Sequence, residues 1–245
     1  ASAEVQQNWT GSSGYTLLRK SLAVVHIVAR RYEQLSGKLL GTANVLDYGC
    51  GYGRLLRLML YFCGAERLNG CDPWERSIDL CRESGIPGRL YVSDYLPERL
   101  LSEDDSVDLA YAFSVFTHTS LRATTAALSA LHGAVRPGGL LVATIRPVEY
   151  WQIDPAIDRA ERAALVAEHQ RSGFAFRPHN REAVDGDVTY GDTSISQKRL
   201  EQLAPGWTIV ATDRTEQDPY QVLVFLRCDA KPGEAPHQGG DGPQP

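Results

Sequence analysis

The segment from Val45 to Leu60, VLDYGCGYGRLLRLML, constrains the fold of this chain more than any other. A short apolar run ends at Asp47, a turn follows that contains Gly49, Gly51 and Gly53, and an amphipathic stretch begins immediately afterwards. This order predicts a buried strand, a glycine turn and a helix. Glycine allows positive φ and a close approach of ligands to backbone N–H groups, which also point outward at a helix N-terminus. The segment therefore predicts a site for a nucleotide-like cofactor at the end of the strand.

An acidic residue ends the next predicted strand. Asp72 directly follows the run Leu68–Cys71, and an acid at this position can accept hydrogen bonds from both hydroxyl groups of an adenosine ribose. Dinucleotide-binding turns have the pattern G-x-G-x-x-G, in which the third glycine allows close packing of the helix on the strand. This chain has G-x-G-x-G, with Arg54 in place of that third glycine. The pattern disfavours a nicotinamide-dependent oxidoreductase, which we keep as an alternative.

The turn from Asp47 to Gly53 resembles the first motif of class I S-adenosylmethionine (SAM)-dependent methyltransferases, in which an acid opens the glycine turn. Further segments match this family in the same order along the chain, and the resemblance covers roughly residues 44–145. The matching segments are a third strand with a terminal acid (Arg89–Asp94), a fourth strand (Ser106–Ser114), a helix with apolar residues at Leu121, Leu128, Leu131 and Val135, the Pro-Gly-Gly turn Arg136–Gly139, and the strand Leu140–Ile145.

The resemblance implies an α/β fold with a doubly wound, seven-stranded Rossmann-like sheet, an antiparallel last strand, and a substrate-covering insertion between strands 5 and 6. It also implies S-adenosyl-L-methionine as the cofactor. Carried over by position, the cofactor-binding residues are Asp47, Gly49 and Gly51 at the methionine end, Asp72 at the ribose, Pro73 and Trp74 beside the adenine, Asp94 and Tyr95 at the adenine edge, and Phe113 and Ser114 under the transferred methyl group. The alternative role for Trp74 is packing at the start of a helix, and the alternative role for Asp94 is to form a turn or cap a helix.

Length and periodicity predict one α/β domain over residues 1–228, which the resemblance implies to be a methyltransferase domain. Within it, residues 12–40 form a helical cover with a helix at Thr16–Leu35. Residues 147–195 form a lid or substrate insertion with a helix at Pro155–Ser172. The domain is predicted to end with the helix Ser196–Leu203 and the strands Trp207–Thr212 and Tyr220–Arg227. Residues 229–245 contain too few apolar side chains to form a core and are predicted to be a disordered tail.

The predicted chemistry requires a proton acceptor. SAM carries an activated methyl group, so the enzyme has to align a nucleophile and exclude water. An alcohol nucleophile is protonated at neutral pH, and a general base is therefore expected. His118 lies just beyond the fourth strand, and His179 lies in a polar segment with Asp192, which could orient it. The alternatives are that His118 positions SAM through a loop contact and that the segment around His179 is a solvated surface loop. The residues predicted to bind the acceptor are Arg177, Arg181 and Tyr190.

Missing features disfavour several acceptors. Phe113–Phe116 stands where enzymes that methylate amino groups of DNA bases usually have an Asn/Asp-Pro-Pro-aromatic turn, and the chain has no Pro-Cys nucleophile for cytosine. A net charge of −5 without a basic stripe argues against nucleic-acid binding. The polar insertion favours O-methylation of a sugar or glycan in polysaccharide biosynthesis, either alone or within a larger glycan-assembly protein. The alternatives are a lipid or secondary-metabolite acceptor, and a scaffold module that binds SAM without turnover.

Composition adds three expectations. No apolar run approaches the roughly 20 residues that a membrane span needs. The five cysteines are scattered without the spacing of paired ligands, so we interpret them as reduced thiols of a cytoplasmic protein. No carboxylate trio stands out, so no metal ligand is predicted, and metal assistance is left open.

Overall fold

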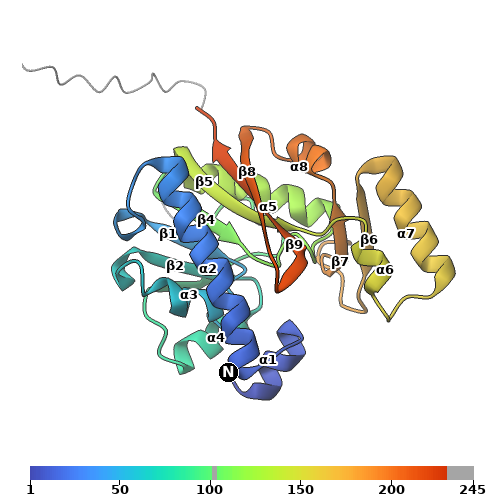
Figure 1. Cartoon of the computed structure of the whole chain (residues 1–245), viewed down its shortest axis with the longest axis horizontal. Coiled ribbons are helices and arrows are strands. Elements are labelled where there is room, and N and C mark those ends of the chain that lie inside the picture. Colours follow the sequence, from blue (N-terminus) through green and yellow to red (C-terminus); the bar gives the residue numbers. More distant parts are fainter. Residues whose placement is uncertain (101–103, 231–245) are drawn as a thin grey trace, which may run out of the picture.

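The computed structural model describes residues 1–100 and 104–230, and its centre is a seven-stranded sheet (Figure 1). Its strands are β1 (Val45–Tyr48), β2 (Leu68–Asp72), β3 (Arg89–Val92), β4 (Val107–Ala112), β5 (Val135–Ile145), β8 (Trp207–Thr215) and β9 (Asp218–Cys228). They lie in the order β3-β2-β1-β4-β5-β9-β8. The first five run parallel, whereas β9 is antiparallel to both β5 and β8. The predicted α/β sheet with an antiparallel last strand is therefore confirmed.

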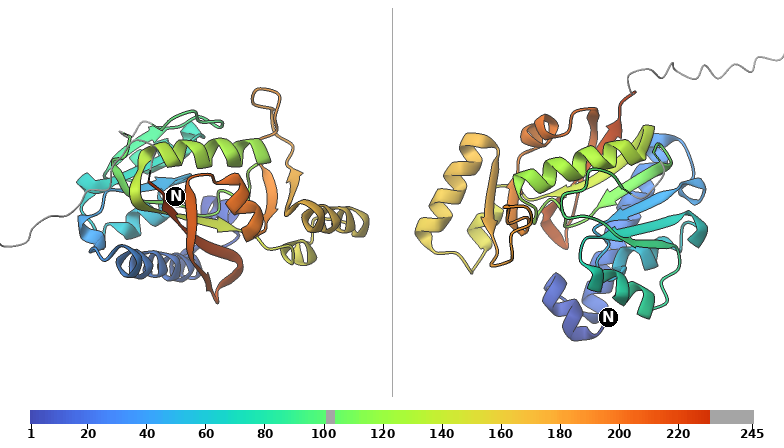
Figure 2. Two further views of the ribbon diagram at one scale, coloured as in Figure 1. Left: turned by 90° about the horizontal axis from the view of Figure 1, so that it is seen from above. Right: turned by 180° about the vertical axis from the view of Figure 1, so that it is seen from behind.

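A helical layer covers each face of this sheet (Figure 2). One layer contains α2 (Gly14–Ser36), α3 (Arg54–Met59) and α4 (Glu75–Glu83), and the other contains α5 (Leu121–Ala134) and α8 (Gln197–Leu203). Neighbouring residues of β1 point to opposite layers, because Val45 belongs to the core beside α2 and Leu46 to the core beside α5. Every residue of β1 and β4 is buried, as expected for central strands covered on both faces. The carboxyl ends of these two strands position the site.

Several predicted elements have shifted ends. Helix α2 begins two positions before the predicted Thr16, at Gly14. Strand β5 begins at Val135, before the Pro-Gly-Gly segment. That segment interrupts the pairing with β4, whose register shifts between Val107–Val135 and Leu109–Leu140, and Gly138 in it has a φ of +78°. The predicted helix from Pro155 begins only at Arg159, as α7 (Arg159–Ser172), because the Asp158 carboxylate caps it by accepting a hydrogen bond of 2.8 Å from the Glu161 amide. A separate short helix, α6 (Tyr150–Ile153), precedes it.

Besides α6, one further helix and two strands were not predicted. The helix α1 (Ala3–Thr10) precedes α2, and the strands β6 (Phe174–Pro178) and β7 (Gly191–Ile195) form a separate antiparallel sheet. This small sheet lies with α6 and α7 beside the main sheet (Figure 1). The buried Trp151 of α6 donates a hydrogen bond of 2.7 Å from Nε1 to Oγ of Ser194 in β7. The insertion is therefore built on its own small core. Two short 3₁₀ helices, η1 (Leu40–Thr42) and η2 (Ala65–Arg67), complete the elements.

Among the helices of residues 1–100 and 104–230, none combines the length and the apolar character that crossing a membrane requires. Most of the predicted tail, residues 231–245, lies outside the described residues.

Candidate cofactor and acceptor site

The glycine turn after β1 has the conformation that the sequence predicts. Gly49 and Gly51 have φ values of +74° and +54°, a region that side chains other than glycine disfavour. A Cβ atom at Gly49 would also collide with Cγ2 of Val115. The turn ends at Gly53, which has a φ of +75° and directly precedes α3. The glycines therefore allow a sharp turn where β1 ends, with the backbone packed closely against Val115.

Asp72 at the end of β2 faces this turn. Its Oδ2 accepts a hydrogen bond of 2.9 Å from the Gly51 amide, and its Oδ1 accepts one of 2.9 Å from the Trp74 amide. Burial raises the pKa of Asp72, and the two amide hydrogen bonds oppose that rise. Because each carboxylate oxygen can accept a second bond, both remain able to bind a pair of hydroxyl groups.

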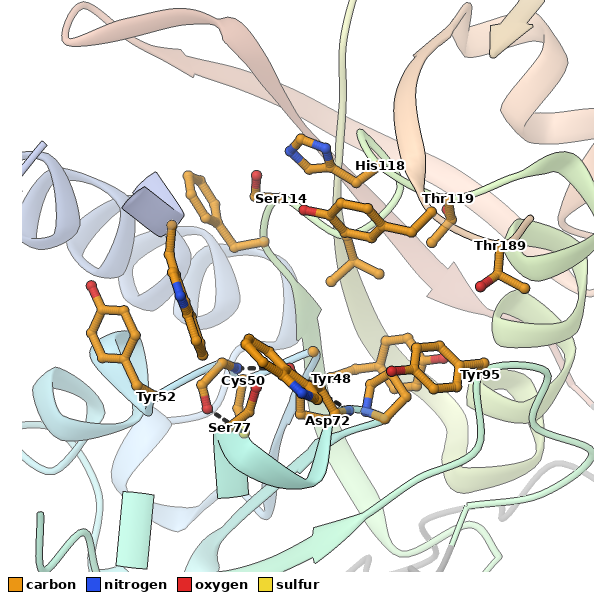
Figure 3. A pocket seen from close by; sticks show the side chains of 18 of the residues that line it. Tyr48, Cys50, Tyr52, Asp72, Ser77, Tyr95, Ser114, His118, Thr119 and Thr189 are labelled. Atoms are coloured by element: carbon orange, nitrogen blue, oxygen red, sulfur yellow. Dashed lines mark hydrogen bonds between the residues drawn. The ribbon is translucent and has the colours of Figure 1, made fainter. Parts of the chain in front are cut away.

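A cavity of about 360 Å³ extends from this turn across the ends of β2, β1 and β4. Figure 3 shows Asp72 and Ser77 on one side of it, and Ser114 and His118 on the other. We call it the larger cavity, to distinguish it from a second cavity of about 90 Å³ that shares part of its wall. The predicted site residues that line it are Gly49, Gly51, Asp72, Pro73, Trp74, Tyr95, Phe113, Ser114, His118, Arg181 and Tyr190. The predicted site residues that do not line it are Asp47, Asp94, Arg177, His179 and Asp192.

The residues outside the cavity wall have other surroundings. Asp47 is buried beneath the turn, where loss of solvent raises its pKa to about 8, and its Oδ2 has no hydrogen-bond partner among the described residues. Asp94 is exposed. Arg177 forms an ion pair of 2.8 Å with Glu161. The structure thus places the glycine turn, Asp72 and the end of β4 around the cavity, whereas the side chains of Asp47, Asp94 and Arg177 lie outside its wall.

Aromatic rings cover the cavity on the side of α1. The ring of Trp9 lies 4.8 Å from that of Trp74 and 5.5 Å from that of Tyr52, measured between centroids. Trp9 also lines the cavity. It was not predicted, although a single tryptophan in an otherwise polar segment was a signal that could have drawn attention to it.

At the other end of the cavity, His118 is bonded through both ring nitrogens. Nδ1 lies 2.8 Å from the Gly191 carbonyl oxygen, and Nε2 lies 3.1 Å from a guanidinium nitrogen of Arg146. These partners require a neutral ring in which Nδ1 donates and Nε2 accepts. Burial, together with the charge of Arg146, lowers the pKa of His118 to about 4. Its ring also stacks on that of Tyr190, with the centroids 5.3 Å apart and the planes at 7°.

Asp192 lies at the centre of a polar network behind this wall. Its Oδ1 accepts a hydrogen bond of 2.7 Å from Arg146, and its Oδ2 lies 2.8 Å from Nε2 of His179. Burial by itself would raise the pKa of Asp192, but the bonds to His179 and Arg146 outweigh it and lower the pKa. The predicted histidine–aspartate pair is therefore formed by His179. Arg146 at the end of β5 was not predicted, because its partners are distant in sequence.

Ser114 is a further unusual residue at the end of β4. It has a φ of +61°, which is uncommon for serine. Its amide donates a hydrogen bond of 2.7 Å to Oγ1 of Thr144, and its Oγ accepts one of 3.1 Å from Nε2 of Gln221 in β9. Non-glycine residues in this conformation cluster at functional sites.

The larger cavity fits the adenosine part of a SAM molecule by three observations. Gly49 and Gly51 place backbone without side chains in the cavity wall, Asp72 retains acceptor capacity for two hydroxyl groups, and aromatic rings flank the opening. Such a set of groups suits a ribose and a planar base. Among the described residues, no group of three or more His, Cys, Asp and Glu side chains is arranged to hold a metal ion.

Comparisons with known proteins agree with this geometry. A family model described as a methyltransferase domain matches residues 45–139. A search of curated proteins found no match. A SAM-dependent methyltransferase from Methanosarcina mazei is 15% identical, with 78% of this chain and 94% of that chain covered and a TM-score of 0.56.

Two further solved structures are similar. Magnesium protoporphyrin IX methyltransferase (ChlM) from Synechocystis, with bound SAH, is 14% identical, with 87% of this chain and 84% of that chain covered and a TM-score of 0.55. DesVI from Streptomyces venezuelae is 15% identical, with 89% and 93% covered and a TM-score of 0.54. At these identities the structures demonstrate a shared fold. Residues 45–139 thus match a methyltransferase domain, and the sheet with its antiparallel last strand has the fold of the SAM-dependent methyltransferases to which the chain is similar.

Proposed function

We propose that this enzyme transfers the methyl group of SAM to a hydroxyl group of a small polar acceptor, most simply a sugar or glycan. The observation that carries the proposal is the polar end of the larger cavity beyond Ser114. That end is lined by His118, Thr119, Thr189, Tyr190 and Arg181. Hydroxyl groups, a neutral imidazole and a cation beside an aromatic ring suit a hydroxyl-rich ligand better than a purely apolar one.

In this proposal the cofactor lies along the turn. The backbone at Gly49 and Gly51 allows close approach, Asp72 accepts hydrogen bonds from the ribose, and Trp74 and Tyr95 flank the adenine together with Pro73. Asp94 is exposed nearby and is assigned to the adenine edge only by resemblance. SAM supplies a methyl group bound to a positively charged sulfur. The protein aligns the acceptor oxygen and excludes water, and Phe113 and Ser114 form the wall between the two ligands.

We propose His179 rather than His118 as the proton acceptor; His179 lies outside the cavity wall, against the Tyr190 ring that lines it. Both nitrogens of His118 are bonded, so its proposed role is to hold the Tyr190 ring. His179 contacts Asp192 through Nε2, and no described residue bonds to its Nδ1. Its ring lies edge-to-face against Tyr190, with 5.4 Å between centroids. The pairing with Asp192 would orient the imidazole and stabilise its protonated form. Arg177 is not included in the acceptor site, because Glu161 pairs with it.

A sugar acceptor would assign the enzyme to glycan assembly. All five cysteines are buried free thiols, which supports a reducing, cytoplasmic setting for the proposal.

The test follows a radiolabelled methyl group from SAM into a panel of monosaccharides, sugar phosphates, fatty acids and plant phenols, with products identified by mass spectrometry. We expect label in sugar ethers that resist mild base. Label confined to fatty acids or phenols would overturn the sugar assignment while leaving the methyltransferase activity in place. His179→Asn should lower turnover about 10²–10⁴-fold while SAM affinity stays unchanged.

A further inference from the structure

The loop between β6 and β7, residues 179–190, places a positive charge at the acceptor end of the larger cavity. Arg181 belongs to this loop and lines the cavity wall. It lies outside residues 45–139, which match the methyltransferase family model. Among the described wall residues that follow Ser114 in the chain, Arg181 is the one with a formal charge, because the pKa of about 4 leaves His118 neutral at pH 7.

Arg181 differs from the neighbouring arginines in having no counter-charge. Three arginines in or beside the insertion are each neutralised by a carboxylate, in the pairs Arg122–Asp185, Arg146–Asp192 and Arg177–Glu161. In the described part of the chain, no carboxylate lies within 4.0 Å of the Arg181 guanidinium, not even that of the adjacent, exposed Glu182. The wall at the acceptor end therefore carries one uncompensated positive charge.

The ring of Tyr190 holds this guanidinium at the cavity. Cζ of Arg181 lies 4.2 Å from the centre of the ring. The ring is itself fixed, because the His118 ring stacks on it with 5.3 Å between centroids and the His179 ring contacts it edge-to-face at 5.4 Å. A guanidinium over an aromatic face keeps the N–H donors along its edges available. Arg181 can therefore form a bidentate pair with an oxyanion while it stays on the ring.

Hydrogen bonds to the start of α5 position the loop without a ligand. Arg122 donates bonds of 2.8 Å to the carbonyl oxygen and 2.7 Å to Oδ2 of Asp185. Ser120 donates a bond of 2.5 Å from Oγ to Oδ2 of Asp187. Because the loop is ordered beforehand, binding of an anion at Arg181 requires little further loss of conformational entropy.

We propose that the acceptor carries an oxyanion group, a carboxylate or a phosphate, near the hydroxyl group that is methylated, and that Arg181 binds this group. A neutral polyol would leave Arg181 without a counter-charge. An oxyanion would pair with it through charge-assisted hydrogen bonds, which are stronger than those to a hydroxyl group. The inference rests on the proposed use of this end of the cavity for the acceptor.

The test compares matched ligands that differ in their anionic group. Glucose is paired with glucuronate and with glucose phosphate, and hydroxybenzamide is paired with hydroxybenzoate. Each ligand is titrated by NMR against the whole chain loaded with S-adenosylhomocysteine. We expect an anionic ligand to bind at least about tenfold more tightly than its neutral counterpart, and Arg181→Gln to remove this preference. The comparison of glucuronate with glucose phosphate distinguishes a carboxylate from a phosphate.

Two further variants make the test specific to this guanidinium. Arg181→Lys keeps the charge but loses the bidentate geometry, so it should retain only part of the preference. Arg171→Gln is the matched control, because Arg171 is an exposed arginine of α7 that does not line the cavity, and it should keep the full preference. S-adenosylhomocysteine should bind each variant with unchanged affinity, which demonstrates that the variant is folded.

The outcomes separate this inference from the function on which it rests. Equal affinity for the anionic and the neutral ligand of every pair would overturn the inference, and so would an unchanged preference in Arg181→Gln or a failure of all the ligands to bind. Radiolabel in neutral sugars, together with any of these results, would retain the proposed function and reject the anionic acceptor. A preference found only for hydroxybenzoate and lost in Arg181→Gln would support the role of Arg181 and overturn the sugar assignment.

Discussion

Arg146 at the end of β5 and Asp192 in β7 form an ion pair of 2.7 Å, in which each side chain is only 11% exposed. The pair joins the main sheet to the small sheet of the insertion. Arg146 also donates a hydrogen bond of 3.0 Å to the Thr117 carbonyl oxygen and contacts Nε2 of His118, while Asp192 binds His179. The same two charges therefore fix both histidines beside the cavity.

Removing one partner of this pair should destabilise the fold strongly. Arg146→Met leaves the buried Asp192 carboxylate without its main counter-charge, and we expect a loss of about 3–5 kcal/mol in the free energy of unfolding. Urea unfolding followed by circular dichroism measures it. The control is Arg122→Met, which removes an exposed pair with Asp185 and should cost at most about 1 kcal/mol. Similar losses in both variants would contradict this account.

His118 should make stability depend on pH. Its pKa is about 4 in the folded protein and about 6.5 in an unfolded chain. Between these values the unfolded His118 binds more protons, so the contribution of His118 to stability rises as the pH rises from about 4 to 6.5 and is constant above that range. Asp47, whose pKa is raised to about 8, contributes a change of opposite sign. The full effect of His118 is on the order of 3 kcal/mol.

Urea unfolding at a series of pH values tests this prediction. His118→Gln should make the slope between pH 4 and 6.5 less positive than in the unaltered protein, whereas His26→Gln, at an exposed position on α2, should leave the slope unchanged. If the His118 variant and the unaltered protein had the same slope, this account of His118 would be wrong.

Two glycine substitutions should have opposite effects. Gly49→Ala introduces a Cβ at positive φ that meets Val115, so we expect a loss of about 1–3 kcal/mol in stability and a large loss of SAM affinity. Gly133→Ala lies in α5, where an added Cβ has nothing within 4 Å. There we expect a gain of about 0.4–1 kcal/mol, because alanine restricts the unfolded chain. Thermal unfolding with and without SAM measures both effects, and an unaffected Gly49 variant would argue against a tight turn.

Asp72→Ala should weaken SAM binding. The substitution removes the proposed ribose acceptor and the hydrogen bonds that hold the Gly51 and Trp74 amides. Charge-assisted hydrogen bonds contribute about 1.5–3 kcal/mol each, so we expect at least a tenfold increase in Kd by titration calorimetry. Asp79→Ala, at a partly exposed carboxylate on α4 that pairs with Arg82, is the control and should bind SAM normally. Unchanged affinity of the Asp72 variant would refute the cofactor site.

The sequence predicted those parts of the molecule whose determinants are local. The turn after Asp47 and the acid at Asp72 each depend on a strand followed directly by its loop, and the sheet follows from their repetition. The strand β7 was missed because it carries polar residues, such as Asp192 and Thr193, which are buried only through partners elsewhere in the chain. Its partner β6 is only five residues long and pairs with β7 alone.

Other site residues depend on tertiary contacts that no local pattern encodes. Trp9 reaches the cavity because α1 folds back toward the glycine turn. Arg146 contributes to the site through its ion pair with Asp192, which is far along the chain. Gln221 lies in a strand whose apolar run predicted only that it belongs to the sheet. The sequence predicted both histidines, but their bonding to Arg146 and Asp192 required the structure.

The walls of the two cavities come from almost the entire length of the chain, from Asn8 in α1 to Gln221 in β9. During synthesis on the ribosome, the glycine turn emerges early, but the last wall residue emerges only near the end. A nascent chain therefore has no complete pocket for most of its translation. A ligand stabilises only the state that binds it. SAM therefore cannot assist the early steps of folding, and it stabilises only the completely folded protein.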